Sequence, residues 1–226
     1  MSQMLSNVSN IIFDLDGTLI DTAPDLSYSL NLLREEHGLP PVEYDQFRKV
    51  VSLGGTAMLN MGFDISSSDP QFQIIRKRFL DIYSKNIYRL SRLFDGMEQV
   101  LEILDAKNIN WGIVTNKPGW LTSPLLEKMQ LSSRALCVIS GDTLPYAKPN
   151  PEPLLHACKI MKCTPSKAIY IGDAKRDIEA GINAGMPTII AAYGYIEENA
   201  TINEWGANSI IDSPLELLDR LNLGAS

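Results

Sequence analysis

Short continuous runs of apolar and β-branched residues recur along the chain, with helical patterns between them. Five runs are clear and a sixth is weaker; they cover residues 10–14, 111–116, 135–140, 168–173, 187–193 and 209–213. They do not alternate between apolar and polar positions, as a strand with one solvated face would. Continuous runs of this kind are typical of parallel strands that helices cover on both faces.

The segments between these runs carry helical spacing. Residues 98–105 place Val100, Leu101 and Leu104 on one side of a helix. Residues 151–161 begin with Pro-Glu-Pro, which suits a first helical turn, and continue with an apolar stripe. The alternation of strand and helix predicts an α/β fold with a doubly wound parallel sheet.

Residues 21–88 interrupt this alternation, because they carry helical signals without a convincing strand. Pro24 can begin a helix that Gly38 can end. A later helix is expected after Pro70, where four apolar residues follow at spacings typical of a helix. These residues are Phe72, Ile75, Phe79 and Ile82.

We therefore expect a small all-helical cap at residues 21–88, inserted after the first strand. The core would consist of residues 1–20 and 89–226. A module inserted at this point lies above the carboxyl ends of the strands, where open α/β sheets bind their ligands.

Composition narrows the classes of partner. The chain has 226 residues, 45% of them hydrophobic, which fits a core domain with a smaller insert. Its net charge of −7 and the lack of a long basic block argue against nucleic acid. The nearest basic run, Arg76 to Arg78, is expected on the solvated face of a helix.

Localisation and assembly are less constrained. No apolar run reaches the roughly 18 residues that span a bilayer, so no membrane partner is expected. The first residues lack the basic start and apolar stretch of a signal peptide, and the three cysteines lack metal-ligand spacing. These features indicate a cytoplasmic protein with reduced thiols; the sequence leaves open whether it is a monomer or a homodimer.

Polar residues suited to catalysis follow the predicted strands. Because the carboxyl ends of parallel strands meet at one edge of a sheet, we expect these side chains to lie together. They are Asp14, Asp16, Thr115, Asn116, Lys148, Asp173 and Asp177.

Each of these residues has an ordinary structural explanation when taken alone. Asp-x-Asp after a strand can form a turn or cap a helix, and an acid in a first helical turn suits the helix dipole. Four acids together are different, because their repulsion and desolvation would cost several kcal/mol without a cation. Mg²⁺ fits best, since it takes carboxylates, water and phosphate oxygens. Carboxylates should also carry the catalysis, because the sequence has only two histidines and no Walker, G-x-G-x-x-G or Gly-x-Ser-x-Gly motif.

Four motifs in this order resemble those of the haloacid dehalogenase superfamily: IIFDLDGTLIDT, Thr115 at a strand end, Lys148 before a proline, and GDAKRD. The segments VTNKP and AKPNPEP are similar to the phosphoglycolate phosphatase-like branch. DTAPDL, GLPPV, WGIVTNKP, YGYI and WGA also resemble the bacterial N-acetylmuramic acid 6-phosphate phosphatases. The resemblance implies a Rossmann-like core, a helical cap and Mg²⁺-dependent hydrolysis of a small phosphomonoester.

The resemblance also implies roles for the acids. Asp14 would be the nucleophile that forms an aspartyl-phosphate, and Asp16 the general acid and base. Asp14, Asp173 and the main-chain carbonyl of Asp16 would bind Mg²⁺. An acid at position 16 favours phosphatases and phosphomutases over dehalogenases, which carry none there.

The remaining motif residues would hold the substrate. Thr115 and Lys148 would contact the phosphoryl oxygens, with Asn116 beside them. Asp177 would not contact the metal or the substrate itself, but would orient either the metal ligands or Lys148.

Substrate choice is expected to depend on the cap. Arg48, Gly54 and Gly55 are the candidates for contact with the leaving group, because the glycines permit a close approach of the backbone. The same segment could equally be a plain helix–helix turn with solvated basic residues. Both 2-phosphoglycolate and N-acetylmuramic acid 6-phosphate carry a carboxylate, so a basic cap residue would suit either small phosphorylated metabolite.

Two alternatives remain open at this point. A phosphomutase similar to the β-phosphoglucomutases would share the core and the helical cap. A non-catalytic phosphate-sensing protein would keep the acidic pocket without turnover, although receiver domains of that kind lack a long helical insert.

Overall fold

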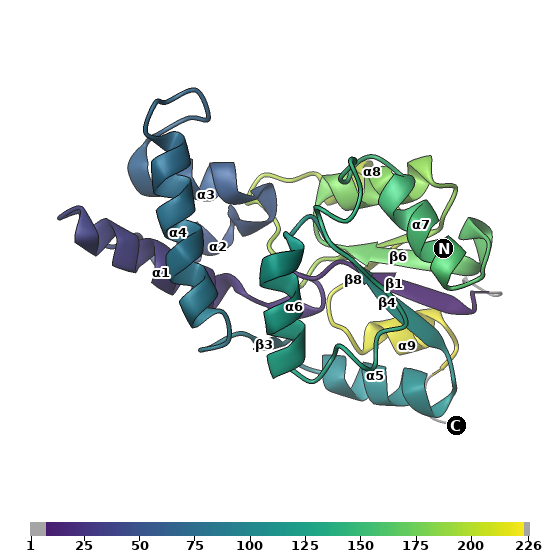
Figure 1. The fold of residues 1–226 in the computed structure, drawn as a ribbon. Coiled ribbons are helices and arrows are strands. Elements are labelled where there is room, and N and C mark those ends of the chain that lie inside the picture. The colour runs from purple at the N-terminus through teal and green to yellow at the C-terminus, as the bar shows by residue number, and fades with distance from the viewer. Residues whose placement is uncertain (1–7, 224–226) are drawn as a thin grey trace.

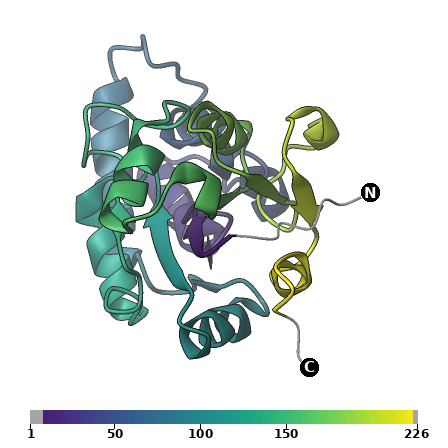
Figure 2. The same cartoon turned by 90° about the vertical axis from the view of Figure 1, so that its right-hand side faces the viewer.

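A six-stranded parallel sheet forms the centre of the protein in the computed structural model, which describes residues 8–223. The strand order is β5-β4-β1-β6-β7-β8, so β1 lies inside the sheet (Figures 1 and 2). The strands are β1 (Asn10–Phe13), β4 (Asn110–Val114), β5 (Val138–Ile139), β6 (Ala168–Gly172), β7 (Thr188–Ala191) and β8 (Ser209–Ile211). The predicted α/β fold with a parallel sheet is confirmed.

Helices cover the sheet on both faces, which explains why its strands are continuously apolar (Figure 1). Successive residues of β1 point to opposite faces: Ile11 and Phe13 belong to one hydrophobic cluster and Ile12 to the other. The first cluster includes side chains of α5 (Met97–Ala106), α6 (Gly119–Lys128) and α9 (Glu216–Arg220). The second includes side chains of α7 (Glu152–Ile160) and α8 (Lys175–Asn183).

A helical insert follows the first strand and stands at one end of the molecule, beyond the sheet (Figure 1). Its α-helices are α1 (Ala23–Glu36), α2 (Tyr44–Arg48), α3 (Gly55–Phe63) and α4 (Phe72–Asn86), with a 3₁₀ turn at Val51–Leu53. The four apolar residues expected to line one side of α4 are all buried. Among residues 8–223, the structure contains no helix that is long and apolar enough to cross a membrane.

A two-stranded antiparallel ribbon lies where the chain enters and leaves the insert. It pairs β2 (Ile20–Asp21) with β3 (Arg92–Leu93), and these strands of two residues each are too short to appear as an apolar pattern in the sequence. The buried carboxylate of Asp25 accepts hydrogen bonds from the main-chain N–H groups of residues 89, 90 and 91. The two connections are therefore held together, close to the expected boundaries, which themselves remain a prediction.

The strands at one edge of the sheet are shorter than their apolar runs. The run at 135–140 yields only Val138–Ile139, because Leu136 is half exposed and the preceding residues form turns. The run at 187–193 ends as a strand at Ala191, after which the chain turns and brings Tyr193 into contact with Arg48 and Tyr195 into contact with Thr22.

Candidate functional site

Three neighbouring strands deliver the candidate residues to one edge of the sheet. Asp14, Thr115 and Asp173 directly follow β1, β4 and β6, and β1 pairs with both of the other strands. All three residues are at most 4% exposed. The main-chain N–H of Asp14 donates to Ile171 of β6, so the sheet's own hydrogen bonds fix the start of this loop.

The ammonium of Lys148 lies between two carboxylates. Its Nζ is 2.7 Å from Oδ1 of Asp14 and 2.8 Å from Oδ1 of Asp177, although the angles there are not those of hydrogen bonds. Lys148 Nζ also donates to the main-chain oxygen of Val114 at 3.1 Å and to the hydroxyl of Tyr170 at 2.7 Å. The side chain is fully buried, so this single cation offsets much of the negative charge at the centre of the site.

Burial of acids that lie together makes their ionisation costly. Burial raises the pKa of Asp14 to about 7; Lys148 opposes the rise, and Asp177 and Asp173 add to it. Burial likewise raises the pKa of Asp173 to about 6, with Asp177 adding to the rise. A cation bound among these carboxylates would relieve this cost.

Three carboxylates are close enough to share a metal ion. Asp14, Asp173 and Asp177 offer oxygens within 4.8 Å of one another, all of them buried. A buried set of hard oxygen donors fits Mg²⁺. This cluster contains Asp177, whereas the sequence-based ligand set pairs Asp14 and Asp173 with the main-chain carbonyl of Asp16.

Asp173 is also one of the points where the insert contacts the core. Its Oδ2 accepts a hydrogen bond from Ser52 Oγ at 2.5 Å and from the main-chain N–H of Tyr195 at 2.9 Å. Its Oδ1 accepts from Thr18 Oγ1 at 3.2 Å. Gly17, at φ +89°, passes so close that an added Cβ would lie 2.2 Å from Asp173 Oδ2, so only glycine fits there.

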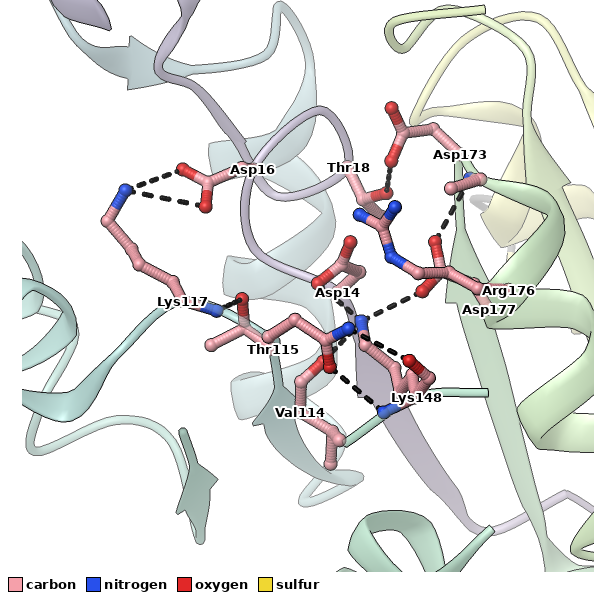
Figure 3. A network of polar contacts seen from close by, with 12 residues as sticks. Asp14, Asp16, Thr18, Val114, Thr115, Lys117, Lys148, Asp173, Arg176 and Asp177 are labelled. Carbon is pink, nitrogen blue, oxygen red and sulfur yellow. Dashed lines mark hydrogen bonds and ion pairs between the residues drawn. The ribbon is translucent and has the colours of Figure 1, made fainter. Parts of the chain in front are cut away.

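The Asp16 side chain turns away from this cluster and toward Lys117 (Figure 3). Lys117 Nζ lies 3.0 Å from Asp16 Oδ1 and donates to the hydroxyl of Tyr83, in α4, at 2.9 Å. The same Oδ1 accepts from Thr22 Oγ1 at 2.6 Å. Contacts from the core, the connection and the insert therefore hold Asp16 jointly.

The charges in this second group support one another. Burial alone would lower the pKa of the Lys117 ammonium, but Asp16 and Tyr83 more than offset it and hold that pKa above its usual value. Burial raises the pKa of the Tyr83 hydroxyl to about 12, so Tyr83 stays neutral and its oxygen accepts a hydrogen bond from the Lys117 ammonium.

The remaining core candidates hold loops in position. The Asn116 amide donates to the main-chain oxygen of Lys148 and accepts from its N–H, both at 3.0 Å. Thr115 Oγ1 accepts from the main-chain N–H of Lys117 at 3.1 Å. Asp177 Oδ2 accepts from the main-chain N–H of Ala174 at 3.0 Å, which caps α8 and aims Oδ1 at Lys148.

A cavity of about 190 Å³ separates the core from the insert. Its polar base contains Asp14, Asp16, Thr115, Asn116, Lys117 and Arg176. Its opposite wall is largely apolar and comes mainly from the insert, with Leu26, Val51, Met58, Phe79, Leu80 and, from the core, Leu121. Polar and charged groups of the core and apolar side chains of the insert thus face each other across one cavity, an arrangement typical of ligand sites.

The three expected cap residues separate in the structure. Gly54 and Gly55 line the cavity. Arg48 lies in a different surface hollow with Asp21 and Arg92, and its guanidinium donates to the carbonyl oxygens of Tyr193 and Gly194 at 3.0 and 2.9 Å. In this arrangement Arg48 joins the insert to the loop after β7 and does not line the cavity with Asp14.

Lys117 and Arg176 belong to the site although the sequence assigns them no role; they lie inside the motifs VTNKP and GDAKRD. Ser52 lies in the segment from Arg48 to Gly55 that is expected to contact the leaving group, but it bonds Asp173 instead. Arg176 donates to the main-chain oxygen of Ser52, while its buried Nε has no hydrogen-bond partner. Arg76 was assigned to a solvated helix face; it is exposed, yet it also lines the cavity.

Comparison with known proteins agrees with this geometry. A family model described as "Haloacid dehalogenase-like hydrolase" matches residues 11–191. The chain is 40% identical over 212 residues to an N-acetylmuramic acid 6-phosphate phosphatase of Pseudomonas aeruginosa, covering 94% of each chain. It is 37% identical over 207 residues to a phosphoglycolate phosphatase of Xanthomonas campestris, covering 92% of this chain and 93% of that one.

A solved structure is similar over almost the whole length. The crystal structure of a predicted phosphoglycolate phosphatase from Haemophilus somnus superposes with a TM-score of 0.84 at 27% identity, covering 95% of this chain and 98% of that one. Residues 11–191, which the family model matches, include Asp14, Asp16, Thr115, Lys148, Asp173 and Asp177. The chain therefore belongs to the haloacid dehalogenase-like hydrolases.

Proposed function

We propose that the protein is a Mg²⁺-dependent phosphatase whose substrate is N-acetylmuramic acid 6-phosphate, with residues 21–88 acting as the cap. The observation that carries this proposal is the cavity in which Asp14 and Asp16 face an apolar wall supplied mainly by the insert. The residues of the core support the proposed phosphatase reaction. The apolar wall of the insert supports the proposed choice of substrate.

Asp14 is the nucleophile. One of its carboxylate oxygens forms a bond to phosphorus while the bond from phosphorus to the sugar oxygen breaks, which gives an aspartyl-phosphate. Lys148, 2.7 Å from Asp14, holds the carboxylate in position and offers positive charge to the phosphoryl oxygens. Thr115 contributes its hydroxyl from the adjacent strand end.

Asp16 moves the protons. It donates a proton to the departing sugar oxygen, and its carboxylate then takes a proton from the water that attacks the aspartyl-phosphate. Because the Asp16 side chain bonds Lys117 and Thr22 in this structure, it must rotate toward Asp14 when substrate is bound. Inorganic phosphate leaves, and Asp14 is regenerated.

The carboxylates supply a site for the cation. Asp14 and Asp173 would hold Mg²⁺ with the main-chain carbonyl of Asp16, while Asp177 holds Lys148 at 2.8 Å. When bound, Mg²⁺ supplies positive charge that offsets the repulsion between the acids and the phosphoryl group.

The apolar wall favours a sugar phosphate over a two-carbon acid. 2-Phosphoglycolate has a single methylene group to place against five apolar side chains from the insert. N-acetylmuramic acid 6-phosphate has ring carbons, an acetyl methyl and a lactyl methyl that can cover this surface. The 40% identity to the Pseudomonas aeruginosa enzyme points the same way, whereas the 37% identity to phosphoglycolate phosphatases makes 2-phosphoglycolate the second candidate.

The test is phosphate release by the purified protein with Mg²⁺, comparing the two substrates and using Asp14→Asn as the blank. We expect kcat/KM for N-acetylmuramic acid 6-phosphate to exceed that for 2-phosphoglycolate by at least about 100-fold, since a well-matched apolar surface is worth several kcal/mol. A preference for 2-phosphoglycolate would overturn the substrate assignment and leave the phosphatase chemistry intact. Release from neither substrate above the blank would overturn the proposed function.

A further inference from the structure

Three consecutive basic residues in α4 have different surroundings. Lys77 Nζ pairs with Asp81 at 2.8 Å, and Arg78 pairs with Glu36, so both charges are neutralised on the outer surface. Arg76 lines the cavity that contains Asp14, and within residues 8–223 it makes no described hydrogen bond, ion pair or ring contact. Its positive charge is therefore available to a ligand.

One face of α4 runs along the cavity. Arg76, Leu80 and Tyr83 are spaced four and three residues apart, and all three line this space. The end of this face at Tyr83 is held close to Asp16, because the Tyr83 hydroxyl accepts a hydrogen bond from Lys117, which pairs with Asp16. In the proposed reaction Asp16 protonates the leaving group. The leaving group would therefore lie along this face of α4, with its ester oxygen near Asp16 and its other end farther from phosphorus.

Arg76 lies at the far end of this path. Seven residues of α-helix separate it from Tyr83, which corresponds to about 10 Å along the axis. Its exposed position places it at the rim of the cavity, with Phe79 and Leu80 between it and Tyr83.

The other cations at the site already have partners. Lys148 pairs with Asp14 and Asp177. Lys117 pairs with Asp16 and bonds Tyr83. Arg176 donates to the main-chain oxygen of Ser52 and is surrounded by the acids of the core, which hold its pKa above the usual value despite the opposing effect of burial. A second negative group on the substrate would therefore find Arg76 free.

We propose that Arg76 determines specificity by binding a carboxylate on the leaving group, separated from the phosphate ester by the width of a sugar ring. This inference rests on the proposed function and names the substrate feature that the cap recognises. The planar guanidinium presents two parallel N–H donors that match the two oxygens of a carboxylate. Phe79 and Leu80, which lie between Tyr83 and Arg76, contact the sugar ring, and Arg76 binds the carboxylate on the far side of that ring.

The position of Arg76 also separates the two candidate substrates. In N-acetylmuramic acid 6-phosphate, several ring carbons separate the lactyl carboxylate from the phosphate ester. In 2-phosphoglycolate, the carboxylate is on the carbon next to the ester oxygen, close to Asp16 and far from the rim. A carboxylate bound at Arg76 therefore indicates a sugar acid phosphate.

The experiment compares N-acetylmuramic acid 6-phosphate with N-acetylglucosamine 6-phosphate, which is the same sugar phosphate without the lactyl ether and its carboxylate. Each is assayed with the wild type, Arg76→Ala, Arg76→Lys and the matched control Lys77→Ala. For Arg76→Ala we expect kcat/KM on the muramic substrate to fall about 10- to 100-fold, mainly through KM, because a charge-assisted pair that binds ground state and transition state alike is lost.

On N-acetylglucosamine 6-phosphate the same variant should stay within about threefold of the wild type, because that substrate has no partner for the guanidinium. Arg76→Lys should retain part of the preference, since it keeps the charge and loses the paired donors. Lys77→Ala should leave both substrates unchanged, because its side chain lies on the outer surface.

The outcomes distinguish this inference from the proposed function. If the wild type prefers the muramic substrate and Arg76→Ala keeps that preference, or loses activity equally on both sugars, the assignment of Arg76 is overturned and the phosphatase remains. If the wild type treats both sugars alike or cleaves only 2-phosphoglycolate, the carboxylate-reading role and the substrate assignment fail together. If no substrate is cleaved above the Asp14→Asn blank, the proposed function itself fails.

Discussion

The two walls of the cavity are built on different physical principles. The core wall consists of polar and charged groups at or just after the ends of strands, where Asp14, Thr115 and Lys117 are each at most 8% exposed. The cap wall consists of apolar side chains from four helical segments, with one free guanidinium at its rim. A change in the core should therefore affect every substrate, and a change in the cap should affect the choice among substrates.

The difference also concerns how each wall is held. The sheet's hydrogen bonds fix the core residues, whereas the insert rests on a few polar contacts across the interface. Ser52 bonds Asp173, Tyr83 bonds Lys117, and Arg48 bonds the loop after β7. Ser52 thus reaches a carboxylate of the buried cluster, Tyr83 reaches the partner of Asp16, and Arg48 reaches the loop that carries Tyr195. We therefore expect closure of the insert over the core to exclude water and to complete the surroundings of the acids at the same time.

The largest effect is expected from Asp14→Asn. Removal of the nucleophilic carboxylate should lower kcat by at least about 10³-fold on every phosphomonoester, because the aspartyl-phosphate can no longer form. Steady-state phosphate release measures this effect, and circular dichroism checks that the variant is folded. Residual turnover that differs between substrates would show that the core wall does not act independently of the leaving group.

Asp16→Asn should have the next largest effect, and one that depends on the leaving group. We expect kcat to fall by roughly 10²-fold or more on a sugar phosphate, because the departing alkoxide needs a proton. The loss should be much smaller for the first step with 4-nitrophenyl phosphate, whose phenolate leaves without protonation. A pre-steady-state burst of nitrophenolate in this variant would check the prediction. An unchanged kcat on the sugar phosphate would contradict the acid and base role.

Tyr83→Phe tests the contact between the two walls. The variant removes one hydrogen-bond partner of the buried Lys117 ammonium, which keeps only Asp16 as a charged partner. We expect the free energy of unfolding to fall by about 1–2 kcal/mol, the usual cost of a lost buried hydrogen bond to a charged group. Urea unfolding measures the change. Ser84→Ala, which removes a hydroxyl bonded only to its own helix, serves as the control in the same turn of α4.

The sequence predicted the core well because its signal is local. A buried parallel strand requires a continuous apolar run, and the residue after that run must lie at the edge of the sheet where ligands bind. Asp14, Thr115 and Asp173 could therefore be located from three short segments. The acids also implied a cation through charge alone, and the buried cluster of Asp14, Asp173 and Asp177 could hold a metal.

The cap residues could not be located in this way. The sequence of a helix includes residues from all of its sides. Which side faces the core depends on how the helix packs against segments that are distant in the sequence. In α2, Phe47 is the only buried residue, so nothing in its pattern fixes where the neighbouring Arg48 points. In α4 the buried stripe was evident, but Arg76 lies at its border, and the sequence does not show which border faces Asp14.

The contacts across the interface were missed for a related reason. Lys117 with Tyr83, and Ser52 with Asp173, join residues that are 34 and 121 positions apart. Each partner has an ordinary local explanation, Tyr83 as a core aromatic and Ser52 as a turn residue. Only the docking of the insert brings them together.

The smallest effect expected is a pH dependence of stability in metal-free protein, and it tests whether burial of charge distinguishes the core wall. Burial raises the pKa of Asp14 from its ordinary value of 3.8 to about 7 and that of Asp173 to about 6. Between the ordinary and the raised values the folded protein binds more protons than the unfolded chain. The free energy of unfolding contributed by these groups therefore falls as the pH rises through this interval.

Other acids with lowered pKa values, such as Asp81, act in the opposite direction, so the comparison must isolate Asp14. We expect the thermal midpoint of the wild type, measured relative to Asp14→Asn, to fall by a few degrees between about pH 5 and about pH 8. Adding Mg²⁺ should raise the wild-type midpoint more at the higher pH, because the ion and the protons compete for the same carboxylates. A difference between the two proteins that does not change with pH would mean that Asp14 ionises as easily in the folded core as in water. In that case charge burial would not be what separates the core wall from the cap.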